Sequence, residues 1–389
     1  MTSTKPILIS GGGLASLLLG KALLRHGIPF EIFERDAGID LRGQGYRLRL
    51  SSEGLDAIES VLDPPSFEHF FEKCGKTGGG GLQSFNAVTG ELIEHKVAEP
   101  ITSREGKVVG IARGDMRMEF MRGCEEHVHW SKHIKGYELT EHGVHGIFSD
   151  GSKTVEGSIL IGGDGLRSEI AKQVSGGKLV VYDTEARGIH GQASTKAFKG
   201  LGEGVFRISD DSQPAGTVGI ITNVRPGDMN DPNIQFGWTM IGQPGVIKAP
   251  NDNYAIVGQT AADLAKSLTA KWNDRFRPLF EEMNVNEAAF WKITCSTPSG
   301  VPVWPNVERV TVIGDAAHSM TPAGGIGANT AVRDSALLGR LLGEARGFRP
   351  GLTEEYEREM RTYASEAVKA SHDYMQATLK FGKLTKTLK

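Results

Sequence analysis

Cysteine is scarce in this sequence, and neither sign of charge is in excess. The 389 residues include three cysteines, Cys74, Cys124 and Cys295. An odd number of cysteines so far apart predicts neither a disulfide framework nor a paired-cysteine zinc site, and it favours a reducing, cytoplasmic location. The 44 Lys and Arg residues nearly balance the 47 Asp and Glu residues, so we expect no nucleic-acid partner.

Long apolar runs are also missing. The most apolar segment, residues 14–24, is interrupted by Gly20 and Lys21 and is too short to span a bilayer. The first residues lack the basic stretch and apolar run that are typical of a signal peptide. We therefore expect no membrane partner and no signal peptide, and the sequence leaves the oligomeric state open.

Glycine is abundant, and its first cluster lies inside a βαβ unit. Residues 6–10 and 29–33 are short apolar runs typical of buried parallel strands, and residues 14–26 have helical periodicity. This order predicts an α/β fold with a right-handed crossover. The remainder of the chain adds a second module, because residues 181–288 contain the alternating runs of antiparallel strands.

The glycine turn after the first strand predicts a bound dinucleotide. It has the form Gly11-x-Gly13-x-x-Ser16, and Glu34 ends the following strand. Gly11 permits the tight turn, Gly13 lets a pyrophosphate approach the backbone, and the helix N-terminus attracts its charge. Glu34 can accept hydrogen bonds from ribose hydroxyls. Ser16 replaces the usual third glycine but is small enough for close packing. This motif alone does not separate FAD from NAD.

Two later segments repeat the pattern of a buried strand that ends in a Gly-Asp pair. Residues 159–168 run Ile-Leu-Ile-Gly-Gly-Asp-Gly-Leu-Arg-Ser, and residues 310–315 run Val-Thr-Val-Ile-Gly-Asp. Ligands of open α/β sheets bind at such carboxyl ends of strands. Together with the glycine turn, these motifs resemble the class A, aromatic-hydroxylase-like FAD-dependent monooxygenases over nearly the whole chain, from Ile7 to about Leu342.

The resemblance implies a fold and a division into domains. The fold would be a Rossmann-like FAD-binding domain with an interleaved, mainly antiparallel β substrate domain and a C-terminal helix. The FAD-binding domain would comprise residues 1–73, 99–180 and 289–389. Residues 74–98 would connect to the substrate domain, which would comprise residues 181–288.

The resemblance also implies the residues that hold FAD. The adenosine diphosphate half would contact the first turn and the end of the second strand, and Arg113 would lie near the flavin and its phosphates. Asp164 would organise the cofactor site, Asp315 would bond the ribityl hydroxyls, and residues 322–329 would surround the isoalloxazine. In full, the expected FAD residues are Gly11, Gly13, Leu14, Ala15, Glu34, Arg35, Arg113, Asp164, Gly314, Asp315, Gly325, Gly327, Ala328 and Asn329. The family's Gly-Gln-Gly is here Gly325-Ile326-Gly327, so no side-chain contact from position 326 is expected.

The family's reaction would consume NAD(P)H and O2. A flavin C4a-hydroperoxide would pass one oxygen atom to an aromatic or polycyclic small molecule. The catalytic set would be Pro322, in the loop beside the flavin, with Arg47, His190 and Gln235 toward the substrate. Arg187, Gln192 and Gly237 are further candidates for the substrate pocket because they lie on strand-like segments, and Arg49, like Arg47, is a candidate to approach the flavin. Three alternatives stay open: a flavin reductase that inserts no oxygen, a non-enzymatic flavin-binding protein and an NAD-dependent dehydrogenase.

Several polar residues have a simpler structural interpretation. Asp164 and Asp315 could cap turns, Arg113 could be a surface ion pair, and His318 is expected to be a packed structural histidine. His127, His129 and His133 lack an acidic or cysteine partner with metal-site spacing, so no metal is predicted. Further expected elements are a loop over 74–81, strands over 143–148, 154–155, 187–192, 217–224 and 234–241, and helices over 116–124, 261–283, 328–343 and 351–380.

Overall fold

A parallel sheet carries the first βαβ unit. The computed structural model describes residues 5–39, 47–78, 82–96, 103–225, 227–379 and 384–386. The strands of this sheet lie in the order β18 (Val310–Val312), β11 (Ile159–Gly162), β1 (Ile7–Ser10), β2 (Phe30–Phe33) and β8 (Val128–His129). All neighbours are parallel. Because the apolar strands β1 and β11 are fully buried, the sheet is covered on both faces, as predicted.

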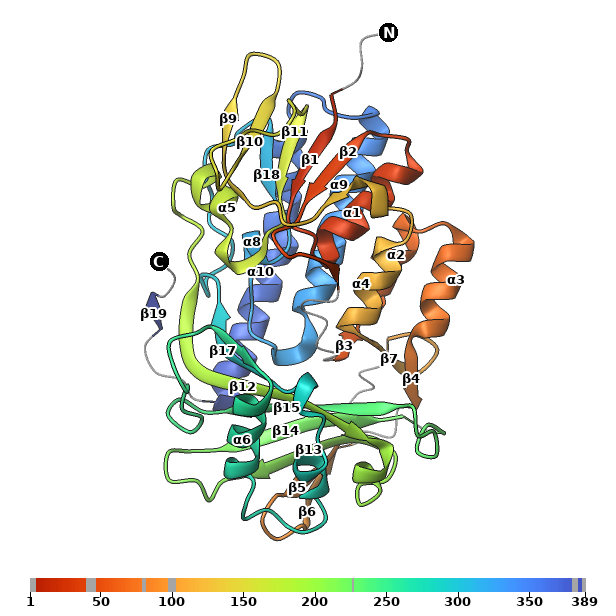
Figure 1. Cartoon of the computed structure of the whole chain (residues 1–389), viewed down its shortest axis with the longest axis vertical. Helices are drawn as coiled ribbons and strands as arrows, with labels where there is room; N and C mark the ends of the chain where they lie inside the picture. The colour runs from red at the N-terminus through yellow and green to blue at the C-terminus, as the bar shows by residue number, and fades with distance from the viewer. Residues whose placement is uncertain are drawn as a thin grey trace.

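Helices from several parts of the chain lie beside and below this sheet (Figure 1). They are α1 (Leu14–Arg25), α2 (Ser52–Val61), α3 (Pro64–Lys73), α4 (Arg113–Met121), α5 (Glu169–Val174), α8 (Asp315–His318), α9 (Gly327–Ala345) and α10 (Leu352–Leu379). Helices α1 and α9 approach closely, since a Cβ on Gly339 would lie 2.5 Å from Ala22 Cβ. Ser335 Oγ also donates a 2.7 Å hydrogen bond to the Ala15 carbonyl. Helix α1 near the start of the chain and helix α9 near its end thus belong to one core.

Two smaller β units flank the parallel sheet. One is the hairpin of β9 (Ile134–Leu139) and β10 (Val144–Phe148), and the other is a three-stranded sheet in the order β3 (Arg47–Leu50), β7 (Lys107–Ala112) and β4 (Gly75–Gly78). The expected loop over 74–81 is therefore wrong for residues 75–78, and residues 79–81 lie outside the described residues. Strand β4 pairs with the side of β7 that β3 leaves open. The sequence of a glycine-rich segment does not show that such a pairing partner exists elsewhere in the chain.

A large, mainly antiparallel sheet forms the second module. Its order is β16 (Ala255–Val257), β17 (Ala289–Cys295), β12 (Tyr182–Ser194), β15 (Gln235–Gly242), β14 (Val218–Val224), β13 (Gly204–Asp210), β5 (Leu82–Asn86) and β6 (Leu92–Lys96), and β19 (Thr385–Lys386) also pairs with β12. Among its neighbours, β13 and β5 pair in parallel. Its strands come from residues 82–96 and 182–295 and from the C-terminal β19, while the proposed domain boundaries stay a prediction.

The two faces of the large sheet differ. Phe236, Trp238 and Met240 are buried on one face, under α6 (Gln259–Leu268) and α7 (Pro278–Glu281), as their alternation predicted. The other face carries Gly237 and, through the pairing of β12 with β15, His190 and Gln192. We call it the inner face, because it meets the parallel-sheet module in Figure 1. The small apolar cluster between the modules includes Ala323 from the segment before α9.

Two expected elements are interrupted. The helix over 261–283 breaks after Leu268, because the Trp272 indole turns inward to donate to Asp210 Oδ2 at 3.0 Å and Pro278 restarts the helix. Residues 154–155 form no strand, and the Thr154 hydroxyl instead accepts from the Gly146 N–H at 2.9 Å.

Short 3₁₀ turns are η2 (Glu125–His127), η3 (Gly165–Arg167), η4 (Thr195–Phe198), η5 (Val285–Glu287) and η6 (Ala323–Gly325). None of the described helices is long and apolar enough to cross a membrane.

Candidate functional site

The glycine turn between β1 and α1 packs directly on the first of the two Gly-Asp pairs, Gly163-Asp164. Gly11 has φ +90°, and a Cβ there would lie 2.6 Å from the Asp164 Cα. Neither conformation nor packing demands glycine at Gly13, since φ is −79° and a Cβ would meet only the Gly163 carbonyl at 3.7 Å. Gly13 begins α1 without a side-chain cap, and Leu14 and Ala15 form its first turn. The missing side chain at Gly13 leaves space for an anion, and the uncapped start of α1 leaves free N–H groups to bind it.

Glu34 braces the glycine turn from the end of β2. Its carboxylate is buried and accepts from the Gly12 N–H at 2.6 Å and the Asp36 N–H at 2.9 Å. The buried Arg117 lies 3.9 Å from the same carboxylate and donates to the Gly12 carbonyl at 3.0 Å. Sequence reasoning missed Arg117. Its position one helical turn after Arg113 was the available signal, because i and i+4 share a helix face.

Asp164 follows β11 and is partly shielded by protein. Its Oδ1 accepts from the Ser168 hydroxyl at 2.6 Å, and Ser168 caps α5. Burial raises the pKa of Asp164 to about 6, and the nearby charge of the exposed Arg35 opposes this shift. The serine in the first motif also packs here, since a Cβ on Gly163 would lie 2.2 Å from Ser16 Oγ. Ser16 stands where the first motif usually has its third glycine, and the absence of a side chain at Gly163 makes room for it.

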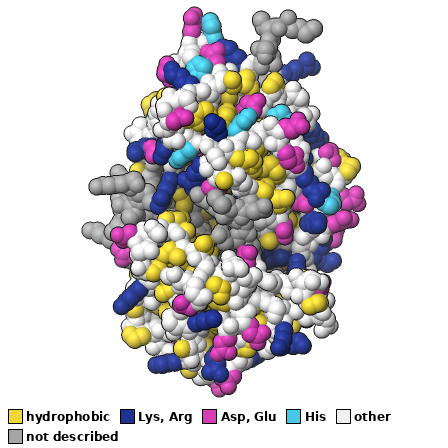
Figure 2. All heavy atoms as spheres, viewed as in Figure 1, with side chains coloured by type: hydrophobic (Ala, Val, Ile, Leu, Met, Phe, Trp, Pro, Cys, Tyr) yellow, Lys and Arg dark blue, Asp and Glu magenta, His cyan; other side chains and the backbone are white. Residues whose placement is uncertain are grey.

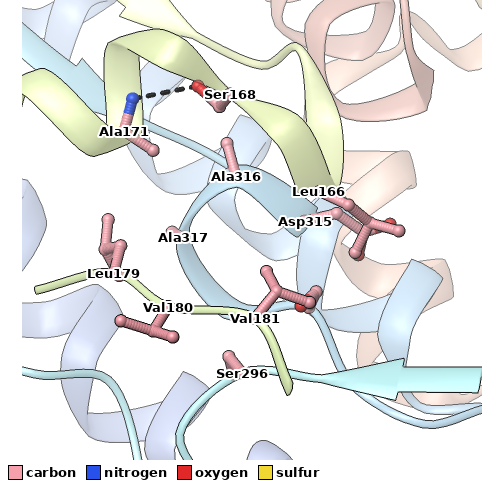
Figure 3. Close-up of a pocket in the computed structure, with 11 residues that line it drawn as sticks. Leu166, Ser168, Ala171, Leu179, Val180, Val181, Ser296, Asp315, Ala316 and Ala317 are labelled. Carbon is pink, nitrogen blue, oxygen red and sulfur yellow. Dashed lines mark hydrogen bonds between the residues drawn. The ribbon is translucent and has the colours of Figure 1, made fainter. Parts of the chain in front are cut away.

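Asp315 begins α8 directly after Gly314, which needs its positive φ of 60°. Solvent reaches the Asp315 side chain, although the surrounding protein raises the pKa of its carboxyl against the charges of His318 and Arg113. The Asp315 carboxyl is therefore open to solvent on one side while protein atoms surround it on the others. A cavity of about 30 Å³ beside it is lined by Leu166 and Val181 (Figure 3) and is large enough only for water.

A buried network of hydrogen bonds holds the third motif, Gly314-Asp315, in place. Asp334 on α9 is fully buried and accepts from the Gly314 N–H and from His318 Nε2, each at 2.6 Å. The Tyr363 hydroxyl on α10 donates to its other oxygen at 2.6 Å. Burial opposes a charge on His318, but the adjacent Asp334 outweighs it and raises the pKa of His318. His318 is thus the structural histidine that the sequence predicted, while Asp334 and Tyr363 gave no sequence signal.

The loop before α9 lies against β3. Pro322 precedes η6, where Gly324 and Gly325 have positive φ, and α9 begins at Gly327 and Ala328 without a side-chain cap. Asn329 is buried, and its amide bonds the Ser51 N–H, the Arg49 carbonyl and the Gly325 carbonyl. Its side chain therefore anchors the loop to the protein and leaves backbone groups to face a ligand.

The candidate substrate residues on β12 and β15 lie on both faces of the large sheet. His190 is buried on the inner face of the large sheet, where burial lowers its pKa to about 4, and its ring touches the space beside Gly237. Gln235 lies exposed at the end of β15 and accepts from Asn284 at 3.3 Å. Arg187 instead alternates to the opposite face and pairs with Asp183 at 2.7 Å. Arg187 thus does not join the inner-face group that contains His190 and Gln192.

The histidines near β8 have neighbours of their own. His127 Nδ1 lies 3.1 Å from the Phe30 carbonyl, and His129 Nε2 lies 2.5 Å from Glu31. Within the described parts of the chain, no three His, Cys, Asp or Glu side chains converge as metal ligands. His133 has its pKa lowered, mainly by burial.

The assembled site fits an extended dinucleotide. Gly11 touches the Gly163–Asp164 backbone, and a Cβ on Gly314 would lie 3.4 Å from Ala15 Cβ, so the three motifs form one surface. The pyrophosphate half of FAD would lie at Gly13 and the α1 N-terminus. Asp315 would meet the ribityl chain, and the uncapped α9 N-terminus would face the flavin ring. Helix N–H groups that donate to phosphate and ring oxygens, and a carboxylate that accepts from hydroxyls, suit a bound FAD.

Comparison with known proteins identifies the class. Residues 117–371 match the family described as FAD binding domain. The chain belongs to this family, within the aromatic-hydroxylase-like FAD-dependent monooxygenases. A solved structure, a putative FAD-containing monooxygenase from Photorhabdus luminescens, has a TM-score of 0.76 and 23% identity, covering 98% of this chain and 100% of that one.

Two curated relatives extend the comparison. The dual O-methyltransferase/FAD-dependent monooxygenase CTB3 of Cercospora beticola is 29% identical over 94% of this chain and 45% of its own length. The FAD-dependent monooxygenase thnD of Trichoderma harzianum is 25% identical over 94% of this chain and 87% of its own. The chain therefore spans less than half the length of CTB3 and most of the length of thnD.

Proposed function

We propose that the protein is an FAD-dependent monooxygenase that consumes NAD(P)H and O2 and oxygenates an aromatic or polycyclic small molecule. The observation that carries this proposal is the convergence of three motifs on one surface, with Gly11 against Asp164 and Ala15 against Gly314. Family membership and the names of the relatives support the oxygenase activity. Bound FAD would supply hydride acceptance and oxygen activation.

The protein's own residues would bind, orient and exclude water. The α1 N-terminus would bind the pyrophosphate, and Asp315 would fix the ribityl chain. The α9 N-terminus would favour the negative charge of a reduced ring. The loop at Pro322 would limit water beside the ring. His190, buried beside Gly237 and neutral at pH 7 because burial lowers its pKa to about 4, would form part of the wall of the substrate site.

Spectroscopy and oxygen uptake test this proposal. Purified protein reconstituted with FAD should show an oxidised-flavin spectrum that NADH or NADPH bleaches under nitrogen. Under nitrogen, a panel of phenols and polyketides should contain a compound that speeds this bleaching, and in air the same compound should be recovered with one added oxygen atom. Bleaching and product formation without oxygen uptake would favour a reductase, and Asp315→Ala should weaken FAD binding.

A further inference from the structure

Two arginines from different modules meet at Gly75, where the large sheet joins the three-stranded sheet. Arg47 comes from β3, and Arg225 directly follows β14. A Cβ on Gly75 would lie 2.3 Å from Arg47 Nη2 and 2.8 Å from Arg225 Nη1. The two guanidinium nitrogens are therefore within about 5 Å of each other, although their residues are far apart in the sequence.

Glycine at this position makes the meeting possible. Gly75 is buried, and its φ is not in the positive region, so its backbone conformation does not require glycine. Any side chain would instead displace both guanidinium groups, since Arg225 Cδ also lies 2.4 Å from the position of a Cβ. The glycine thus serves to leave room for two cations.

The charges at this junction are only partly compensated. Arg225 pairs through Nε with Asp228 at 2.5 Å, while its Nη1 is the atom that lies toward Arg47. Arg47 Nη2 donates to the Gly75 carbonyl at 3.0 Å. Burial, followed by the charge of Arg225, lowers the pKa of Arg47 to about 10, although the nearby charges of Asp228 and Asp115 oppose this shift. An anion placed between the two guanidinium groups would relieve this repulsion.

The pair lies close to the loop expected beside the flavin. Arg49 shares a face of β3 with Arg47, and its Nη2 donates to the Gly324 carbonyl at 3.1 Å. The backbones of Arg47 and Arg49 are therefore separated by roughly 7 Å, the usual spacing of residues two apart on one face of a strand. This distance is about the length of two fused aromatic rings. The junction also meets the inner face of the large sheet, since Thr77 donates to Asn223 at 2.9 Å.

We propose that Arg47 and Arg225 form a subsite for a carboxylate or another planar oxyanion on the substrate. The inference rests on the proposed function, because it places the acidic group of the substrate at one end and the reacting carbon toward the Pro322 loop. Planar guanidinium groups bind such oxyanions through paired, charge-assisted hydrogen bonds. The subsite would therefore select acidic aromatic compounds over neutral ones and set which ring carbon faces the flavin.

Matched acid and ester probes test the subsite in the FAD-loaded protein. 1-Hydroxy-2-naphthoate and its methyl ester would be titrated at pH 7.5, and binding would be followed by the change in the flavin spectrum. We expect the acid to bind about tenfold more tightly than the ester. Arg225→Gln should bring the ratio close to one while FAD stays bound, and Arg225→Lys should restore part of the preference.

Controls separate this effect from general loss of charge. Arg277→Gln removes a surface arginine of the opposite face, which pairs with Asp274 at 2.7 Å, and should leave the preference for the acid unchanged. Equal affinity for acid and ester in the parent protein, or no binding of either, overturns the proposal. So does a preference that survives Arg225→Gln.

A second anion source gives a different pattern. If the pair binds the 2′-phosphate of NADPH, Arg225→Gln will raise the KM for NADPH but not for NADH and leave the acid-to-ester ratio unchanged, which also overturns the proposal. Failure of the proposed function would appear elsewhere, as absence of bound FAD or absence of bleaching by NAD(P)H in the parent protein. The two failures are therefore distinguishable.

Discussion

The backbone N–H of Gly314 donates to the buried carboxylate of Asp334, and this 2.6 Å hydrogen bond joins the third motif to α9. The same carboxylate accepts from His318 and Tyr363. The position of Asp315 thus depends on Asp334, a fully buried residue of α9. Asp334 is a positioning residue, and its removal should affect stability and cofactor affinity together.

Asp334→Asn should destabilise the protein by about 3–5 kcal/mol, because it leaves the charge of His318 buried without its partner. Tyr363→Phe removes one hydrogen bond to the same carboxylate and should cost about 1.5–3 kcal/mol. Urea unfolding of the apoprotein measures both, and FAD titration shows whether affinity falls in the same order. Equal stability of Asp334→Asn and the parent protein would contradict the network.

Alanine at the two glycines of the first turn should have opposite consequences. Gly13→Ala should fold normally, because its Cβ would make only an ordinary 3.7 Å contact, yet FAD affinity should fall about 100-fold, since the methyl group occupies the approach of the pyrophosphate. Gly11→Ala should fail at folding, because φ is +90° and its Cβ would lie 2.6 Å from Asp164 Cα. Melting temperatures with and without FAD distinguish the two. A Gly13→Ala protein that binds FAD as tightly as the parent would remove this assignment.

Asp164→Asn should stabilise the apoprotein above pH 6. Burial raises the pKa of Asp164 to about 6, so the folded state favours the protonated carboxyl. The stability that this protonated carboxyl contributes is lost as the pH rises from about 4 to 6. Partial solvent access limits the gain at pH 8 to about 1–2 kcal/mol, and almost no gain should remain at pH 4. Thermal melts at the two pH values test this, with Asp150→Asn as an exposed control. A gain that is equal at both pH values would exclude the burial explanation.

His190 should make folding sensitive to acid. Burial lowers its pKa to about 4, so the stability that its neutral form contributes is present above pH 6.5 and is lost as the pH falls through 4. His190→Gln should therefore lose less stability than the parent between pH 7 and 4.5, by about 2–3 kcal/mol. Urea titrations of both proteins at the two pH values give this difference. Parallel losses in both proteins would show that His190 is not held neutral.

Local sequence patterns predicted the strands and helices that carry the motifs. Strand β1, helix α1 and helix α9 follow from apolar runs and helical periodicity near glycine. The convergence of Gly11 with Asp164 came only through the family resemblance, since no local pattern encodes a contact between such distant segments. Arg117 and Asp334 were missed because their polar side chains are buried by tertiary contacts, and Arg187 was misplaced because strand register decides which face a side chain occupies.

The contact of Gly11 with the Gly163–Asp164 backbone also bears on synthesis by the ribosome. The first motif leaves the exit tunnel long before its supporting neighbour has been translated, and the segment at Asp315 follows later still. At roughly 5–20 residues per second, the turn must wait many seconds for its partners. We therefore expect the nascent chain to acquire its cofactor late in translation or after release, and partial chains to remain colourless.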